Sequence, residues 1–360
     1  MMQPSRHFFP GGNTAHGFHS FFDQLLPLSD ARRIFILKGG PGVGKSTFMR
    51  RIGRALEEHG YAVEYLHCAS DSESLDGVVC SVLGLLLLDG TAPHVVDPKM
   101  PGAVDSMLNL GMYLDEEALS AHKADIFSLT RDISAWFTRA YHYLAAANHL
   151  REDTSQTLHA ITDEEKLLQL AKPWLDTLLA HRSLAVSGRE RRLFASAISP
   201  QGRVQYLDTL ALPRLWRVTG PWASDTHRVL ASLRDAAIHV GLDVEGFYCP
   251  LQPDRLEHLS IPTLGLFITT ENDYHVFTTV AERTLDLRSA LPDELPTALQ
   301  KALAYDRGMF DQLLSQAIAA IAQSKALHDD LEKLYVKYMD FSALEPLFAQ
   351  TFSKIQTLFL

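Results

Sequence analysis

Residues 39–47, Gly-Gly-Pro-Gly-Val-Gly-Lys-Ser-Thr, decide the fold of the first part of this chain. The preceding residues, 33–37, are apolar and β-prone, and residues 46–59 carry apolar side chains at helical spacing. A strand, a glycine-rich turn and a helix in this order are the context that a phosphate-binding loop requires. The sequence therefore predicts such a loop here.

The loop meets the pattern G-x-x-x-x-G-K-[ST], which ends at Lys45 and Ser46. Its glycines let phosphate oxygens approach the backbone amides, and the positive end of the following helix attracts the anion. Lys45 adds a cation for the β- and γ-phosphates, and the Ser46 hydroxyl can ligate Mg²⁺. We expect Mg-ATP here, because the chain lacks the N-K-x-D motif of guanine sites. The residues expected to contact the nucleotide are Gly39, Gly40, Pro41, Gly42, Val43, Gly44, Lys45, Ser46 and Thr47.

Composition narrows the class of protein. A chain of 360 residues, 46% of them hydrophobic, has the length and the core for two domains. The formal net charge of −10 argues against general nucleic-acid binding, which needs a basic surface. Three scattered cysteines form no disulfide framework, and no apolar run approaches the length of a membrane span. No signal peptide is recognisable at the start, so we expect a cytoplasmic protein without a membrane partner.

Strands and helices alternate through the first third of the chain. Residues 15–26 are predicted to be a short helix, and residues 62–68 and 83–88 to be strands. The second of these strands is wholly apolar, as expected for a strand buried on both faces of a parallel sheet. The expected fold class is therefore α/β, with a doubly wound, mainly parallel sheet.

A long helical appendage follows this α/β unit. Apolar residues recur at helical spacing from Leu119 to Ala147, and a polar break at residues 151–157 precedes a further helical stretch at 163–182. We expect these two stretches to form an antiparallel helical pair that projects from the sheet.

The chain is an internal duplication. An offset of 181 residues aligns residues 33–94 with the second half without gaps, and it places Gly60 on Gly241 and Cys68 on Cys249. A second helical stripe begins at Leu299. We therefore expect a phosphate-binding loop domain at residues 1–186 and a second domain of the same kind at 187–360.

The second loop has lost its phosphate chemistry. Thr226 and His227 replace the lysine and the serine, and Thr270 stands where the first half has Asp89. Asp225 adds a negative charge that would repel a polyphosphate. The second copy is therefore predicted to be catalytically inactive.

Carboxylates beside the first loop are candidates for catalysis. Asp89 ends a buried strand, the usual place for the carboxylate that holds Mg²⁺, although such an aspartate can also cap a turn. Asp71 and Asp76 are candidates for a general base, a water-positioning group or a second metal contact, with a solvated acidic loop as an equal alternative. Cys68 and its counterpart Cys249 are better explained as buried residues than as nucleophiles.

Other polar residues are assigned more ordinary roles. His67 and His94 show no metal-ligand spacing, and His94 aligns with His275 of the inactive copy, so hydrogen-bonding histidines are favoured. An arginine from the second half could complete the phosphate site if the two halves face each other. The arginines considered for that role, each more simply a surface residue, are Arg214, Arg217 and Arg228.

Five stretches resemble one family. They are RHFFPGGNTAHGF, RIFILKGGPGVGKSTFMRRIG, VEYLHCASDSESLDGV, LDGTAPHVVDPKMPGAV and GRERRLFASAISPQG. The chain is similar to an uncharacterised bacterial family of tandem P-loop NTPases, whose members are labelled ATPases or nucleotide kinases. The resemblance implies nucleotide binding at Lys45, Ser46 and Thr47. The second loop departs from the family pattern at Trp222, Asp225, Thr226 and His227.

Three functions remain open from the sequence. The first is an ATPase with one competent site, in which Asp71 or Asp76 orients water and the appendages transmit the nucleotide state. The second is a small-molecule or nucleotide kinase, and the third is a nucleotide-gated scaffold without turnover. The appendages could contact a second copy of the chain or another protein.

Overall fold

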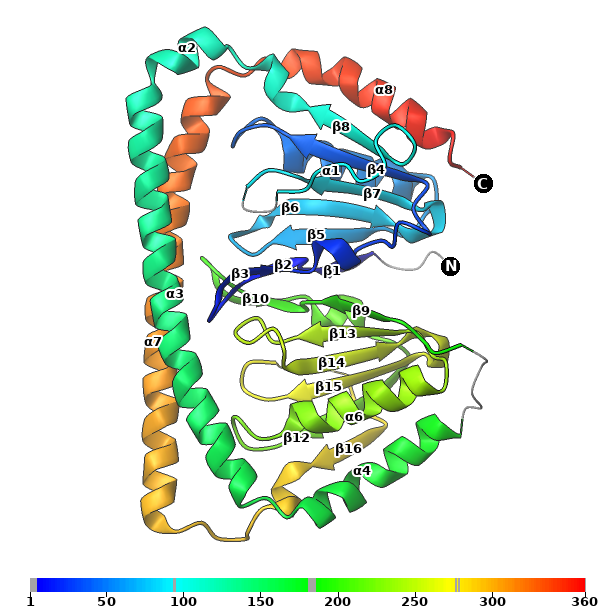
Figure 1. Cartoon of the computed structure of the whole chain (residues 1–360), viewed down its shortest axis with the longest axis vertical. Helices are drawn as coiled ribbons and strands as arrows, with labels where there is room; N and C mark the ends of the chain where they lie inside the picture. Colours follow the sequence, from blue (N-terminus) through cyan, green and yellow to red (C-terminus); the bar gives the residue numbers. More distant parts are fainter. Residues whose placement is uncertain (1–4, 93–94, 181–185, 276, 278, 360) are drawn as a thin grey trace.

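The computed structural model describes residues 5–92, 95–180, 186–275, 277 and 279–359. Two six-stranded mixed sheets are stacked along the long axis of the molecule, and two long helices run beside both of them (Figure 1). The predicted α/β class and the predicted duplication of the α/β unit are confirmed.

In the first sheet the strand order is β1-β5-β6-β7-β4-β8. Among the described residues, β6 runs antiparallel to both of its neighbours and the other three pairings are parallel. The sheet is therefore mixed and mostly parallel, with β6 as the antiparallel strand. Its strands are β1 (Arg6–Phe8), β4 (Arg33–Lys38), β5 (Glu64–Cys68), β6 (Asp71–Cys80), β7 (Leu85–Asp89) and β8 (Asp105–Asn109).

The second sheet has the same order and the same pairing senses, from β16 to β9. Gly84 and Gly265, which are 181 residues apart, both end a 3-10 turn with φ of 58°. The backbone thus keeps the register that the sequence alignment predicts. The strands of this sheet are β9 (Glu190–Leu193), β12 (Arg214–Thr219), β13 (Val244–Tyr248), β14 (Leu256–Ile261), β15 (Leu266–Glu271) and β16 (Arg283–Asp286).

Alternating side chains place the two faces of each sheet in different cores. In β4, Phe35 and Leu37 pack with helix α1 (Lys45–Glu58), whereas Ile34 and Ile36 belong to a central core. The equivalent strands of the second half contribute to the same central core, together with Phe22, Leu25, Leu26, Leu207 and Leu210, so one face of each sheet is buried in a shared apolar cluster. The helices on both faces that a doubly wound domain would have are therefore replaced on the inner face by this shared core.

One local prediction is wrong, and one of two open alternatives is excluded. Residues 15–26 form no α-helix, because β2 (Gly11–Thr14) turns at Gly17, with φ of 96°, into the antiparallel strand β3 (Gly17–Ser20). The 3-10 helix η1 (Phe22–Gln24) follows. The acidic segment after Cys68, for which the sequence leaves a solvated loop as one of two equal alternatives, is strand β6. The second half repeats the hairpin as β10 (Ser196–Ser199) and β11 (Gly202–Gln205).

Ion pairs and hydrogen bonds join the two halves within one chain. The backbones of Phe9 and Phe194 exchange hydrogen bonds of 2.9 and 3.1 Å. Beside them lies a buried cluster of two arginines and two glutamates, one of each from each half. Every arginine in this cluster contacts both glutamates; its members are Arg6, Glu64, Arg191 and Glu245.

The helical arms pair differently from the prediction. Helix α3 (Lys123–Ala160) packs antiparallel against α7 (Thr297–Val336), its counterpart in the second half, and not against α4 (Glu164–Leu179) (Figure 1). The polar residues 151–157 do not interrupt α3, whose last turns lie against the second half.

Each arm ends on the opposite half. Helix α4 follows the first half in sequence but packs on α6 (Thr226–His239) of the second half. Helix α8 (Leu344–Gln356) returns to cover α1, and Arg51 and Glu345 form a two-bond ion pair there. The remaining helices are α2 (Glu116–Ala121), α5 (Leu207–Leu210), η2 (Ser81–Leu83), η3 (Leu110–Tyr113), η4 (Pro262–Leu264), η5 (Leu287–Ala290) and η6 (Phe341–Ala343).

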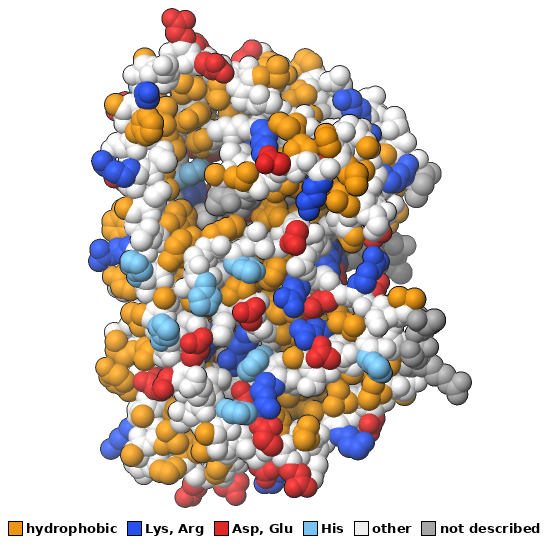
Figure 2. All heavy atoms as spheres, viewed as in Figure 1, with side chains coloured by type: hydrophobic (Ala, Val, Ile, Leu, Met, Phe, Trp, Pro, Cys, Tyr) orange, Lys and Arg blue, Asp and Glu red, His pale blue; other side chains and the backbone are white. Residues whose placement is uncertain are grey.

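Within the described residues, none of the helices has both the length and the apolar character needed to cross a bilayer. Acidic and basic side chains are interspersed over the face shown in Figure 2.

Candidate functional site

The glycine-rich loop connects β4 to α1. Three of its glycines have positive φ: 147° at Gly39, 70° at Gly42 and 87° at Gly44. A side chain is strained at such angles, so the backbone path depends on these glycines. Helix α1 begins at Lys45, directly after Gly44, and its first amides therefore face the loop.

Lys45 and Asp89 meet at this loop from neighbouring elements. The Lys45 ammonium donates hydrogen bonds to the carbonyl oxygens of Gly39 and Gly40, at 2.8 and 2.9 Å. Its Nζ lies 3.6 Å from Oδ2 of Asp89, at the end of β7. The other Asp89 oxygen accepts the amide N–H of Thr91 at 2.8 Å, which fixes the carboxylate toward the lysine.

Ser46 links the loop to strand β6. Its hydroxyl oxygen accepts the N–H of Leu75 at 2.9 Å and keeps a second lone pair. A hydroxyl and a carboxylate are hard oxygen ligands of the kind that Mg²⁺ prefers, so Ser46 and Asp89 fit the metal role predicted for them. Thr47, in contrast, lies exposed on the first turn of α1, and Val43 is buried beneath the loop.

The two aspartates of β6 lie in different surroundings. Asp76 is buried, one residue beyond the paired positions Gly77 and Leu88, which sets it across from Asp89 on the adjacent strand. Asp71, at the start of β6, forms an ion pair of 3.3 Å with Lys325 of α7. Asp76 is therefore the better placed of the two for a role beside Asp89.

Burial and the neighbouring Asp76 carboxylate raise the pKa of the Cys68 thiol well above its usual range. Such a thiol stays protonated and is a poor nucleophile, as the sequence interpretation holds. His67 bonds to the carbonyl oxygen of Ser72 at 2.7 Å, and burial lowers its pKa to about 4, so it is a neutral hydrogen-bonding residue. His94 lies outside the described residues.

The arm of the second half covers the first loop. A Cβ at Gly40 would lie 2.7 Å from the Tyr335 ring, and one at Gly42 would lie 2.9 Å from the carbonyl oxygen of Glu332. The glycines thus also permit close packing of α7. Because Lys325 reaches Asp71 from the same helix, the first site combines a loop of the first half with an arm of the second.

The arginines considered as partners for this site remain in the second half. Arg214 pairs with Glu282, and Arg217 pairs with Glu271. Arg228 binds Glu164 of α4, with its NH1 2.6 Å from Oε1. The cation that reaches the first site from the second half is instead Lys325, which no pattern in the sequence sets apart from the other charged residues of its helix.

Three groups of side chains among the described residues bring possible metal-ligand atoms within 4.8 Å of one another. One lies on α7, near the first loop, one lies within the second half, and one joins α3 and α4 to the second loop. These groups are His328, Asp329 and Glu332; Glu257, His258 and His275; and His159, Glu164 and Asp225.

The second loop keeps part of the backbone shape of the first. Ala223, the counterpart of Gly42, has φ of 64°. The Asp225 carboxylate bonds to His159 of α3 at 2.7 Å and to Arg228 at 3.2 Å, so its charge is compensated by side chains. Burial lowers the pKa of His227 to about 4, so a neutral imidazole stands where the first half has Ser46. This loop therefore lacks the groups that bind a nucleoside triphosphate.

The strained alanine gives a testable prediction. Ala223→Gly is expected to raise the free energy of unfolding by about 0.5–1 kcal/mol, because glycine relieves the left-handed strain but makes the unfolded chain more flexible. Ala236→Gly, inside α6, is the matched control and should lower it by about 1 kcal/mol. Urea denaturation measures both, and destabilisation by both variants would contradict the strain at Ala223.

Comparison with protein-family models, with curated proteins and with solved structures finds no match for this chain.

Proposed function

We propose that this protein is a Mg²⁺-dependent ATPase with one competent site, formed by the glycine-rich loop of the first half. The observation that carries the proposal is the convergence of Lys45 and Asp89 on a loop whose three glycines have positive φ. A cation, a carboxylate and free backbone amides at a helix start form the combination that a polyphosphate and its metal ion need.

Each residue then has a definite task. When the nucleotide binds, Lys45 would give up its hydrogen bonds to the carbonyl oxygens of Gly39 and Gly40 and donate to β- and γ-phosphate oxygens instead. Its positive charge would offset the negative charge that develops on the phosphate oxygens. Mg²⁺, held by Ser46 and Asp89, would neutralise further phosphate charge. Asp76, buried beside the end of β7, is proposed to orient the attacking water.

The contact between the loop and α7 suggests how the nucleotide state could be transmitted. Tyr335 and Glu332 of α7 pack on Gly40 and Gly42. A change in the shape of the loop must therefore either displace α7 or be resisted by it. Helix α7 pairs with α3 along the whole molecule (Figure 1), and both halves would receive the movement. This coupling favours an ATPase with a mechanical output over a kinase.

The fate of the γ-phosphate tests the proposal. Wild-type protein incubated with γ-labelled ATP and Mg²⁺ is expected to release free phosphate, and an excess of EDTA should stop the release. ATP binding without release, and no labelled product when metabolite pools are added, would instead support the nucleotide-gated scaffold. A labelled product that forms only with those pools would support a kinase.

A further inference from the structure

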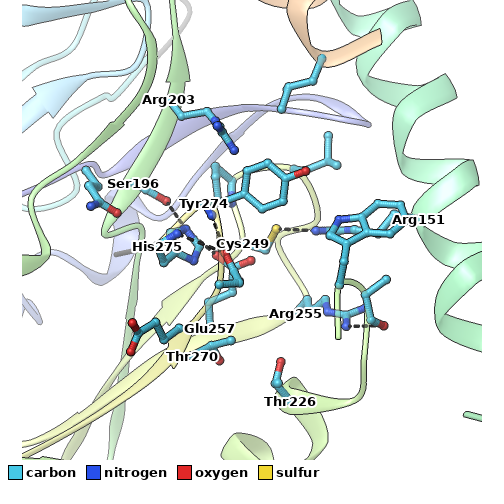
Figure 3. Close-up of a pocket in the computed structure, with 18 of the residues that line it drawn as sticks. Arg151, Ser196, Arg203, Thr226, Cys249, Arg255, Glu257, Thr270, Tyr274 and His275 are labelled. Carbon is cyan, nitrogen blue, oxygen red and sulfur yellow. Dashed lines mark hydrogen bonds and ion pairs between the residues drawn. The ribbon is translucent and has the colours of Figure 1, made fainter. Parts of the chain in front are cut away.

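The second half contains a pocket at its degenerate loop. Its walls come from residues 220–224 and Thr226 of the loop, the β10–β11 hairpin, the end of β15 and both long arms (Figure 3). The cavity measures about 100 Å³. It is smaller than the roughly 300–1,000 Å³ of sites for drug-sized ligands, so it suits a small molecule rather than a nucleotide.

Two buried guanidinium groups face this pocket. Arg151 comes from α3 and donates to the Cys249 sulfur at 3.0 Å, and Arg255 donates to the carbonyl oxygens of the loop residues Ala223 and Ser224 (Figure 3). Neither arginine has a carboxylate at ion-pair distance among the described residues. Burial, together with the nearby charge of Arg151, lowers the pKa of Arg255 to about 10. Buried cations without an ion-pair partner favour an anion between them.

The other charged side chains around the pocket do not remove its preference for an anion. Arg203 enters from another side and lies over the Tyr274 ring, 4.1 Å from its centre (Figure 3). Of the two carboxylates in the lining, Glu271 is ion-paired with Arg217. Glu257, 3.5 Å from the Nε2 atom of His275, is the remaining negative charge, against three arginines.

Buried polar atoms without hydrogen bonds cluster on the same pocket. Four of them belong to side chains that are each less than 10% exposed and that come from separate elements. Groups of this kind are rare in native proteins because each costs the free energy of its lost hydration. These atoms are Arg151 Nε, Ser224 Oγ, Thr270 Oγ1 and His275 Nδ1.

One wall of the pocket is aromatic. Trp222 and Phe310 lie with ring centres 5.0 Å apart, and Tyr274 packs against Phe310 at 5.9 Å. A ligand that satisfies both kinds of wall has an acidic group for the arginines and a small planar or apolar body for the rings.

We propose that this pocket binds a small organic anion, a carboxylate or a phosphate monoester with a compact apolar body. The loop that lost its triphosphate chemistry would then have kept an anion site of a different size. Since Arg151 belongs to the arm of the first half and Ser224 to the loop of the second, the ligand joins the two halves. This inference does not depend on ATP hydrolysis at the other site.

Calorimetric titration without ATP tests the proposal, with benzoate and phenyl phosphate as probes. Benzamide and inorganic phosphate are the matched controls, because they lack the negative charge and the apolar body respectively. We expect one or both probes to bind clearly more tightly than either control. Tighter benzoate binding would indicate a carboxylate ligand, and tighter phenyl phosphate binding a phosphate monoester.

Two variants locate the binding. Arg151→Met should weaken it at least about tenfold, through loss of a charged hydrogen bond, while Arg139→Met, exposed on the same helix, should not. Thr270→Val removes an unpartnered hydroxyl, so it should leave the thermal midpoint of the free protein unchanged or raised and still weaken the probe several-fold. Equal binding of benzoate and benzamide, no response to either anionic probe at millimolar concentration, or unchanged affinity in Arg151→Met would overturn the assignment.

Discussion

Lys45→Ala is expected to lower the rate of ATP hydrolysis by roughly 10²- to 10³-fold, the usual loss when one preorganised donor to the developing charge is removed. The lysine is held within 3.6 Å of Asp89 and bonds to two loop carbonyl oxygens, so it is in position before the substrate arrives. Alanine keeps the start of α1 helical, and the loss should therefore be one of chemistry and not of fold. Release of labelled phosphate under saturating Mg-ATP measures it.

The matched control for this experiment is Lys172→Ala, which removes the same charge from the exposed face of α4. Its hydrolysis rate should equal that of the wild type. If Lys45→Ala keeps the wild-type rate while its thermal midpoint is unchanged, the glycine-rich loop is not the site of hydrolysis. That result would leave the anion pocket of the second half unaffected, because its lining includes no residue of the first loop.

Secondary structure is predicted correctly from the sequence where the residues of one element are enough to determine its conformation. The apolar, β-prone run 33–37, the glycines of the loop and the apolar stripe of α1 each specify a conformation without reference to distant residues. The 181-residue register also held, because paired glycines such as Gly84 and Gly265 need the same left-handed angle. The ATP site itself remains a proposal.

Contacts with residues distant in the sequence determine the structure of the segments that local patterns do not identify. Strand β6 begins with alternating serines and acidic residues, which resemble a loop, yet β5 pairs with this part at Asp71 and Leu75. Its later residues, 77–80, are paired with β7. Residues 15–26 have helix-compatible apolar spacing, but Gly17 turns the chain back and the Phe21 ring packs with Phe194 of the other half, with ring centres 4.8 Å apart.

The arms show a different limit of sequence reasoning. An amphipathic stripe shows that a helix packs against a partner but does not identify that partner. The sequence therefore predicts that α3 pairs with α4, which follows it in the chain, whereas α3 packs against α7. The apparent polar break at residues 151–157 continues the helical period: Arg151, Thr154 and Leu158 are all buried. This spacing was the available signal that the end of α3 contacts a polar site, and it leads to the pocket that Arg151 lines.

Trp174→Ala is expected to lower the free energy of unfolding by about 3–5 kcal/mol, the range for removing a large buried aromatic side chain. Trp174 belongs to α4, which the sequence assigned to the first domain at residues 1–186, but its ring lies 4.9 Å from that of Trp216 in the second sheet. Together with Leu167, Ala171 and Leu178 it forms one face of α4 against the second half. The variant should therefore destabilise the half that follows α4 in sequence.

Leu168→Ala is the control on the same helix, because that side chain is 64% exposed and its removal should cost less than about 0.5 kcal/mol. Urea denaturation followed by near-UV circular dichroism compares the two variants. Since the inner faces of both sheets share the central core, a loosened second half also removes support from the first, and we expect one broad loss of structure. Similar small losses in both variants would mean that α4 does not dock on the second sheet, and the exchange of arms between the halves would then be wrong.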